Sequence, residues 1–121
     1  VRRNRVLIVE DSPTWAMLVA HWVRSLSYEV FCVETLAAAI SHVKTNDDLL
    51  CVFLDLGLPD VLDYDALPAL VNADPHIPIV VLSGRDTVSL PTITAEGARM
   101  FLHKNRASPE SIAQVLEDIV S

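Results

Sequence analysis

Glycine and cysteine are scarce in this chain, and each shortage excludes a class of protein. Only three of the 121 residues are glycine, and the tetrapeptide EDSP at 10–13 stands where a glycine-rich phosphate-binding loop would follow the first apolar run. The two cysteines, Cys32 and Cys51, lie inside predicted strands without the paired spacing of a metal site. We therefore expect buried, reduced thiols and a cytoplasmic protein.

Basic residues are also few. Nine Lys and Arg stand against 16 Asp and Glu, which gives a formal net charge of -7 and a field that opposes nucleic-acid binding. The basic cluster Arg2, Arg3 and Arg5 opens the chain, where a solubilising role is favoured over a nucleic-acid-binding arm. No apolar run approaches the roughly 18 to 20 residues of a membrane-spanning helix. We expect neither direct nucleic-acid binding nor membrane insertion.

The length suits one domain, which we assign to residues 1–121, and the start at Val1 rather than Met suggests a piece of a longer protein. Strands are expected at about 5–9, 29–33, 50–54, 77–82 and 98–102, and helices at about 13–26, 35–44, 65–72, 88–96 and from 109 onwards. This alternation predicts an α/β fold. Its simplest topology is a flavodoxin-like, doubly wound, five-stranded parallel sheet of order 2-1-3-4-5 with five helices.

Local signals set the ends of the helices. Ser12-Pro13 and Ser108-Pro109 each place a favoured cap before a proline, which suits the first helical position. Gly97 is the expected left-handed stop of the fourth helix. Pro68 is tolerable only in the first turn of its helix. In the first helix, one apolar stripe is expected to face the sheet; it consists of Leu18, Trp22 and Leu26, with Trp15 and Val19 beside them.

Four of the apolar runs end at polar residues. Glu10 and Asp11 follow the first strand, Asp55 follows the third, Ser83 ends the fourth run, and Lys104 ends the run that holds the fifth. The carboxyl ends of parallel strands meet at one edge of a sheet, where ligands of open α/β folds bind. Three carboxylates gathered there would repel one another, so the site calls for a cation, and oxygen ligands suit Mg²⁺, or Mn²⁺ in its place.

These residues resemble the receiver domain of two-component response regulators over essentially the whole chain. The resemblance rests on four motifs in the correct order, VLIVEDSP, FLDLGLPD, VVLSG and GARMFLHK. It implies a phosphoacceptor signalling domain rather than an enzyme, a domain that assists its own phosphorylation and dephosphorylation.

The resemblance also implies separate roles for the residues. Asp55 would take the phosphoryl group from a histidine kinase or a histidine phosphotransfer protein, and Lys104 would pair with Asp55 and then with a phosphoryl oxygen. Asp11, Asp55 and the backbone carbonyl of Gly57 would bind the metal directly, and Glu10 mainly through water. Ser83 would hydrogen-bond to the phosphoryl group.

The implied output is a change of shape. Movement of the Ser83 loop would let Phe101 rotate inward and bias the face made by helix four, strand five and helix five. A downstream effector domain or protein would read that face, and a homodimer formed through it is compatible with the sequence.

The chain departs from the family pattern at a few positions. Asn105 follows Lys104 where the family usually has proline, so we expect a trans peptide with a rearranged loop or a strained cis bond. Asp63 stands where a glycine is usual. Gly57 and Arg85 occupy positions that in this family tune the lifetime of the phosphate: a small Gly57 would leave room for attacking water, whereas Arg85 would shield or hold the phosphoryl group.

Other interpretations stay open. Taken alone, Asp55 suits a loop cap, Ser83 a local turn, Lys104 a solvated charge and Phe101 ordinary packing. A degenerate receiver that acts only as a protein-binding module is one alternative function, and a flavodoxin-like small-ligand binder is another. A magnesium-dependent phosphatase would normally need a second acid two residues after its nucleophile, where this chain has Gly57.

Overall fold

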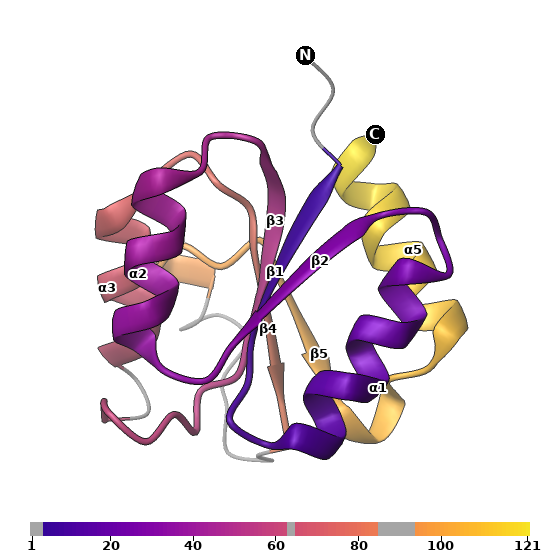
Figure 1. The fold of residues 1–121 in the computed structure, drawn as a ribbon, viewed down its shortest axis with the longest axis horizontal. Helices are drawn as coiled ribbons and strands as arrows, with labels where there is room; N and C mark the ends of the chain where they lie inside the picture. Colours follow the sequence, from indigo (N-terminus) through magenta and orange to yellow (C-terminus); the bar gives the residue numbers. More distant parts are fainter. Residues whose placement is uncertain (1–3, 63–64, 85–93) are drawn as a thin grey trace.

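The computed structural model describes residues 4–62, 65–84 and 94–121. Within them, five parallel strands form one sheet in the order β2-β1-β3-β4-β5, as predicted (Figure 1). The elements in chain order are β1 (Arg5–Val9), α1 (Pro13–Arg24), β2 (Glu29–Val33), α2 (Leu36–Thr45), β3 (Leu49–Leu54), α3 (Ala66–Ala73), β4 (Ile79–Ser83), β5 (Met100–His103), the 3-10 helix η2 (Lys104–Arg106) and α5 (Pro109–Val120).

The helix count differs from the prediction. Four α-helices, rather than five, lie in the described part of the chain. The expected helix at about 88–96 falls largely on residues 85–93, which lie outside it, as do Asp63 and Arg85. Thr94 and Ala95 are helical, and Gly97 has φ 111°, the left-handed conformation expected of it. A Cβ on Gly97 would also lie 2.8 Å from Cγ2 of Val71, so any side chain there would require the Val71 side chain on α3 to shift.

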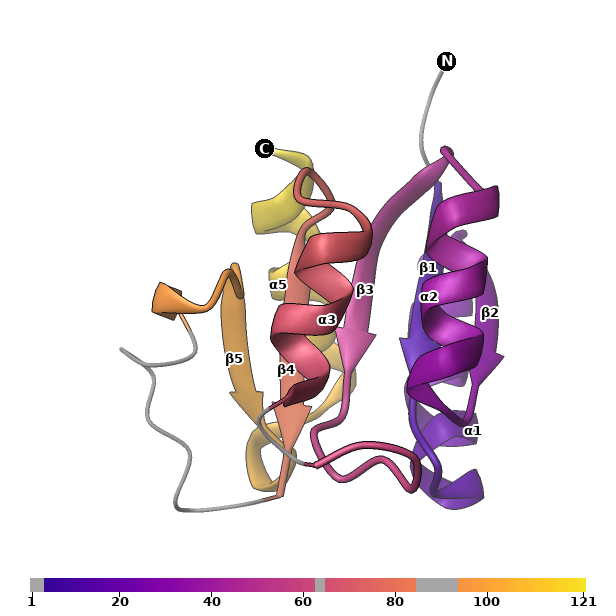
Figure 2. The ribbon, with the colours of Figure 1, turned by 90° about the vertical axis from the view of Figure 1, so that its left-hand side faces the viewer.

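Alternate residues of the strands supply two separate cores. Leu7, Val9 and Val52 pack under α2 and α3, whereas Val6, Ile8 and Phe53 pack under α1 and α5. Figures 1 and 2 show the same arrangement, with one pair of helices on each face of the sheet. A sheet covered on both faces needs strands that are apolar throughout, which is why β1, β3 and β4 read as unbroken apolar runs.

Two predictions about burial are wrong. In the predicted stripe of the first helix, Leu18 and Leu26 are each 38% exposed, and Leu26 lies beyond the end of α1 at Arg24. The rest of the stripe does face the core: Val19 is buried together with Ala20 and Val23, and Trp15 and Trp22 are partly buried against it. Cys32 is exposed because β2 is an edge strand, whereas Cys51, in the central strand β3, is buried as expected.

The predicted starts of α1 and α5 are confirmed. The Ser12 side chain accepts a hydrogen bond from the N–H of Trp15 at 3.4 Å, and Pro13 is the first residue of α1. The Ser108 hydroxyl accepts from the N–H of Ser111 at 3.0 Å at the start of α5. Pro68 lies in the first turn of α3. These caps orient the helices whose preceding loops border the carboxyl edge of the sheet.

Candidate functional site

Three acidic side chains gather at the carboxyl edge of the sheet. Glu10, Asp11 and Asp55 each offer an oxygen such that the three atoms lie within 4.8 Å of one another. Glu10 and Asp55 are 4% and 8% exposed, and Asp11 is exposed. The sheet holds two of the three backbones: the N–H of Asp55 donates to the carbonyl of Val9 at 2.9 Å, and the N–H of Glu10 donates to the carbonyl of Val33 at 3.0 Å. The three carboxylates therefore lie close together, with Asp11 on the exposed side of the group.

Lys104 reaches this cluster from the end of β5. Its Nζ lies 2.8 Å from Oε2 of Glu10 and 3.7 Å from Oδ1 of Asp55. The same ammonium lies 5.1 Å from the centre of the Trp15 ring, a cation–π contact supplied by α1. The shorter of the two carboxylate contacts is with Glu10, a partner that the sequence alone did not indicate.

Glu10 occupies the most confined position of the three acids. Its Oε1 accepts a hydrogen bond from the N–H of Ser12 at 3.1 Å while Oε2 contacts Lys104. Burial raises the pKa of Glu10, the bond to Lys104 works against that rise, and the neighbouring Asp55 carboxylate adds to it. The local charge favours the arrival of a further cation.

Gly57 lies beside the central acid. A Cβ built at this position would be 3.6 Å from Oδ2 of Asp55, which is ordinary van der Waals contact. The backbone of the loop after β3 thus passes along the carboxylate, and the missing side chain leaves free space next to it.

The other predicted residues lie at the expected strand ends. Ser83 is the last residue of β4 and is 1% exposed. Phe101, in β5, is partly buried against the core under α2 and α3, with its ring 6.4 Å from that of His103. The Lys104–Asn105 peptide is trans and begins η2, so the cis bond that was one of the two expectations is not found.

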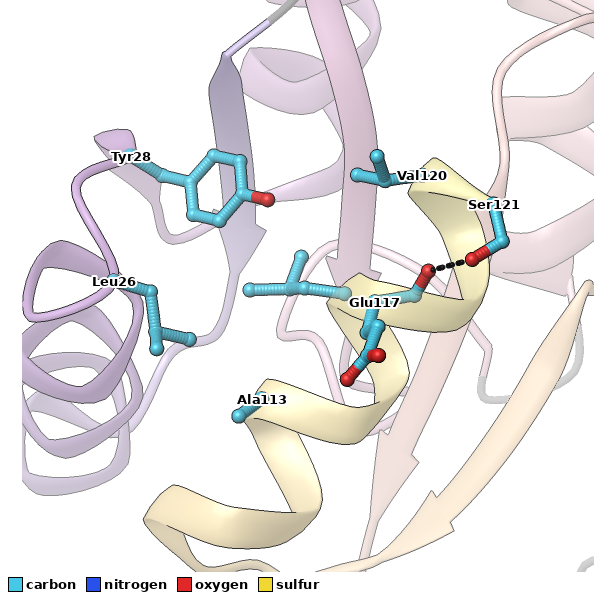
Figure 3. A pocket seen from close by; sticks show the side chains of 7 residues that line it. Leu26, Tyr28, Ala113, Glu117, Val120 and Ser121 are labelled. Atoms are coloured by element: carbon cyan, nitrogen blue, oxygen red, sulfur yellow. Dashed lines mark hydrogen bonds between the residues drawn. The ribbon is translucent and has the colours of Figure 1, made fainter.

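A separate groove of about 310 Å³ opens at the other edge of the sheet, where α1 and α5 end (Figure 3). Its wall on α5 includes Ala113, Glu117 and Val120, and Leu26 and Tyr28 face them. The Ser121 hydroxyl donates to the carbonyl of Glu117 at 2.8 Å. The groove shares no residue with the acidic cluster and is not part of the candidate site.

A model of the response regulator receiver domain matches residues 6–117. The chain belongs to this family. Receiver domains are signalling domains of two-component systems, so the resemblance inferred from the four motifs is confirmed. No helix within the described ranges is long and apolar enough to cross a membrane.

The curated relatives that the chain matches are longer proteins. The chain is 31% identical over 113 residues to the cell cycle transcriptional regulator CtrA of Caulobacter vibrioides, covering 92% of this chain and 48% of that protein. It is 30% identical over 115 residues to the DNA-binding response regulator MtrA of Mycolicibacterium smegmatis, covering 93% and 49%. The chain thus spans about half the length of these relatives.

Solved receiver domains share the whole fold. One is the signal receiver domain of a putative Luxo repressor protein from Vibrio parahaemolyticus, with a TM-score of 0.81, 30% identity, and coverage of 98% of this chain and 93% of that one. Another is the receiver domain of a sensor histidine kinase from Pseudomonas aeruginosa, whose active-site cleft coordinates a magnesium ion. Its TM-score is 0.85 at 21% identity, with 98% of each chain covered.

Two features of the structure were not predicted from the sequence. Trp15 lies four residues after Asp11 in the sequence, and nothing in that spacing predicts its contact with Lys104. Asp60 bonds to the start of α2, and its place after Leu58-Pro59 predicts only a turn. Both contacts join segments far apart in sequence, which a local pattern does not report.

Proposed function

We propose that Asp55 accepts a phosphoryl group from a phosphohistidine of a histidine kinase or histidine phosphotransfer protein. The observation that carries the proposal is the environment of this carboxylate: it is buried, it lies within 4.8 Å of oxygens of two other acids, and Lys104 stands 3.7 Å away. A strand-end acid that only caps a loop does not require two further carboxylates and an ammonium beside it.

The donor set fits a hard divalent cation. Asp11, Asp55 and the Gly57 carbonyl would hold Mg²⁺, or Mn²⁺, with Glu10 acting through water. All the donors are oxygens, the kind that Mg²⁺ prefers in combination with water and phosphate. When bound, the ion would neutralise negative charge on the acceptor and phosphoryl oxygens. The magnesium ion in the Pseudomonas receiver domain supports this assignment.

The residues of the chain then have distinct tasks in the transfer. An oxygen of Asp55 attacks phosphorus, a P–O bond forms, the P–N bond to the imidazole breaks, and the imidazole leaves with that electron pair and takes up a proton. Lys104 pairs with a phosphoryl oxygen, for which it must give up part of its contact with Glu10. The Ser83 hydroxyl donates to another phosphoryl oxygen.

The new phosphate is also the proposed signal. It adds about -1.5 to -2 charge beside Ser83 and draws the following loop toward the site. Phe101 then turns inward, and the face containing β5 and α5 shifts between two arrangements. The predicted fourth helix belongs to that face but lies mostly outside the described residues.

The partners follow from the same proposal. A kinase or phosphotransfer protein supplies the phosphoryl group in the cytoplasm, and an effector domain or a separate protein reads the output face. CtrA and MtrA, named as a transcriptional regulator and a DNA-binding response regulator, are about twice as long as this chain, which supports an effector within a longer protein. The domain of residues 1–121 itself would not bind nucleic acid, and a homodimer through the output face is compatible with the proposal.

Intact mass spectrometry tests the proposal. Incubation with Mg²⁺ and a small acyl phosphate should add one phosphoryl group, and removal of Mg²⁺ with a chelator should prevent the addition. Asp55→Asn should abolish it. Absence of the adduct in the folded wild-type chain would contradict the proposal and favour a receiver that acts only as a binding module.

A further inference from the structure

Asp60 ties the loop after β3 to the first turn of α2. Its Oδ1 accepts a hydrogen bond from the N–H of Leu36 at 2.9 Å, and its Oδ2 accepts from the N–H of Ala37 at 3.0 Å. The Thr35 side chain accepts from the N–H of Ala38 at 3.1 Å. The first amides of a helix have no partner within it, so three of these donors are satisfied, two of them by a residue from a distant loop.

The charge of Asp60 suits this position. An acid at the beginning of a helix is stabilised by the helix dipole as well as by the N–H groups. The bonds from Leu36 and Ala37 lower the pKa of Asp60, which keeps the carboxylate ionised and both of its oxygens available as acceptors.

The loop held in this way is the one that carries Gly57. Leu56 and Leu58 are buried in the core under α2 and α3, and Gly57 lies between them with its backbone alongside Asp55. Asp60 is the next point of attachment along the loop. Figure 2 shows this segment leaving β3 and running along the lower edge of the molecule toward the beginning of α2.

We infer that Asp60 is a positioning residue for the metal site, because its two bonds to α2 fix the loop that presents the Gly57 carbonyl. The inference rests on the proposed function, in which that carbonyl is a ligand. A loop that is already fixed does not have to be ordered when the ion binds, whereas a free loop loses conformational freedom at that moment and binds more weakly.

Thr35→Ala is the matched control for Asp60→Ala. Both changes remove side-chain caps from the beginning of α2, but only Asp60→Ala also releases the loop after β3. Isothermal titration calorimetry of the metal-free protein with MgCl₂ measures the affinity. Relative to the wild type, Asp60→Ala should bind Mg²⁺ about fivefold more weakly, and the affinity of Thr35→Ala should change by less than about twofold. Urea unfolding of both variants shows whether their losses of stability are comparable.

Asp60→Asn provides a second measurement should the alanine variant fail to fold. The amide keeps one carbonyl acceptor and turns an N–H group toward the other donor, so its Mg²⁺ affinity should fall between those of the wild type and Asp60→Ala. Equal Mg²⁺ affinity in both Asp60 variants and Thr35→Ala overturns the inference and leaves the proposed function intact. A wild-type chain that binds no Mg²⁺ overturns both.

Discussion

Each edge of the sheet holds a cation between two carboxylates, and the two arrangements differ in burial. At the carboxyl edge, Lys104 contacts Glu10 and Asp55, with side chains that are 13%, 4% and 10% exposed. At the amino edge, Arg5 contacts Glu29 at 3.2 Å and Asp48 at 3.3 Å, where the side chains are 24%, 60% and 36% exposed. Each cation also lies 5.1 Å from an aromatic ring, that of Trp15 or of Phe31.

The difference separates a site from a surface contact. At the amino edge two acids meet one guanidinium in water, and such ion pairs contribute about 0 to 1 kcal/mol. At the carboxyl edge a third acid, Asp11, joins the group, and burial makes charge without compensation costly. Similar contact geometry therefore has different consequences: at the Arg5 cluster one cation meets two carboxylates, whereas at the Lys104 cluster one cation meets three, an excess of negative charge that suits the proposed metal ion.

The largest predicted contrast comes from removing each cation. Lys104→Met should slow phosphorylation by an acyl phosphate about a hundredfold, because it removes a preorganised donor to the transferring group. Arg5→Ala should leave the rate unchanged and cost about 1 kcal/mol or less of folding stability. Intact-mass time courses and urea unfolding measure the two effects, and equal rates in the two variants would remove the functional distinction between the edges.

Mg²⁺ should stabilise the fold only through the carboxyl edge. A ligand that binds the native state at 100 times its Kd adds about 2.7 kcal/mol to the free energy of unfolding. We expect this increase in the wild type and in Arg5→Ala, and a much smaller one in Asp11→Asn, which lacks a proposed ligand. Urea unfolding with and without MgCl₂ gives the values. An increase that Asp11→Asn retains in full would place the ion elsewhere.

Glu10 should make the stability of the metal-free protein depend on pH. The native pKa of Glu10 is raised above the ordinary value of 4.5. The stability that this shift contributes to the native state is therefore fully present below about pH 4.5 and is lost as pH rises through the native pKa. Glu10→Gln removes this titration. Between pH 4.5 and neutrality, the stability of the wild type should therefore fall relative to that of the variant. A difference that stays constant with pH would show that Glu10 is not perturbed.

The smallest predicted effect is that of His42, at the amino edge, on the free energy of unfolding. Its dependence on pH is opposite to that of Glu10. Burial, and then the charge of Arg5, lower the pKa of His42, whose Nε2 is buried without a hydrogen bond beside the ring of Phe31. The native pKa of His42 lies below the ordinary value of 6.5. The stability that neutral His42 contributes is therefore fully present above pH 6.5 and is lost as pH falls through the native pKa. His42→Phe should reduce that loss in urea unfolding without altering Mg²⁺ affinity.

The sheet and its polar edge could be predicted from sequence because both depend on local patterns. Strands covered on two faces are apolar throughout, so the first polar residue after each strand marks the same edge of the sheet. Serine followed by proline marks a helix start for reasons confined to one turn. Asp55 and its neighbours were therefore found without a structure.

Other features depend on packing between distant segments. The apolar period of α1 does not reveal that Ala20 and Val23 join Val19 in its buried face, or that Leu18 is 38% exposed. Lys104 lies 2.8 Å from Glu10 but 3.7 Å from Asp55, and it joins the ends of strands that are not neighbours in the sheet, a contact that no local pattern reports. The exposure of Cys32 could have been predicted from the sequence, because the predicted strand order already placed its strand at the edge of the sheet.

The position of the phosphoryl group tests the central claim most directly. After reaction with Mg²⁺ and an acyl phosphate, reduction of the acyl phosphate by borohydride followed by peptide mapping identifies the modified side chain. We predict modification of Asp55 alone, at one group per chain. Modification of Glu29 or Asp48 at the Arg5 edge, or spread over many acids with Asp55 intact, would contradict the account.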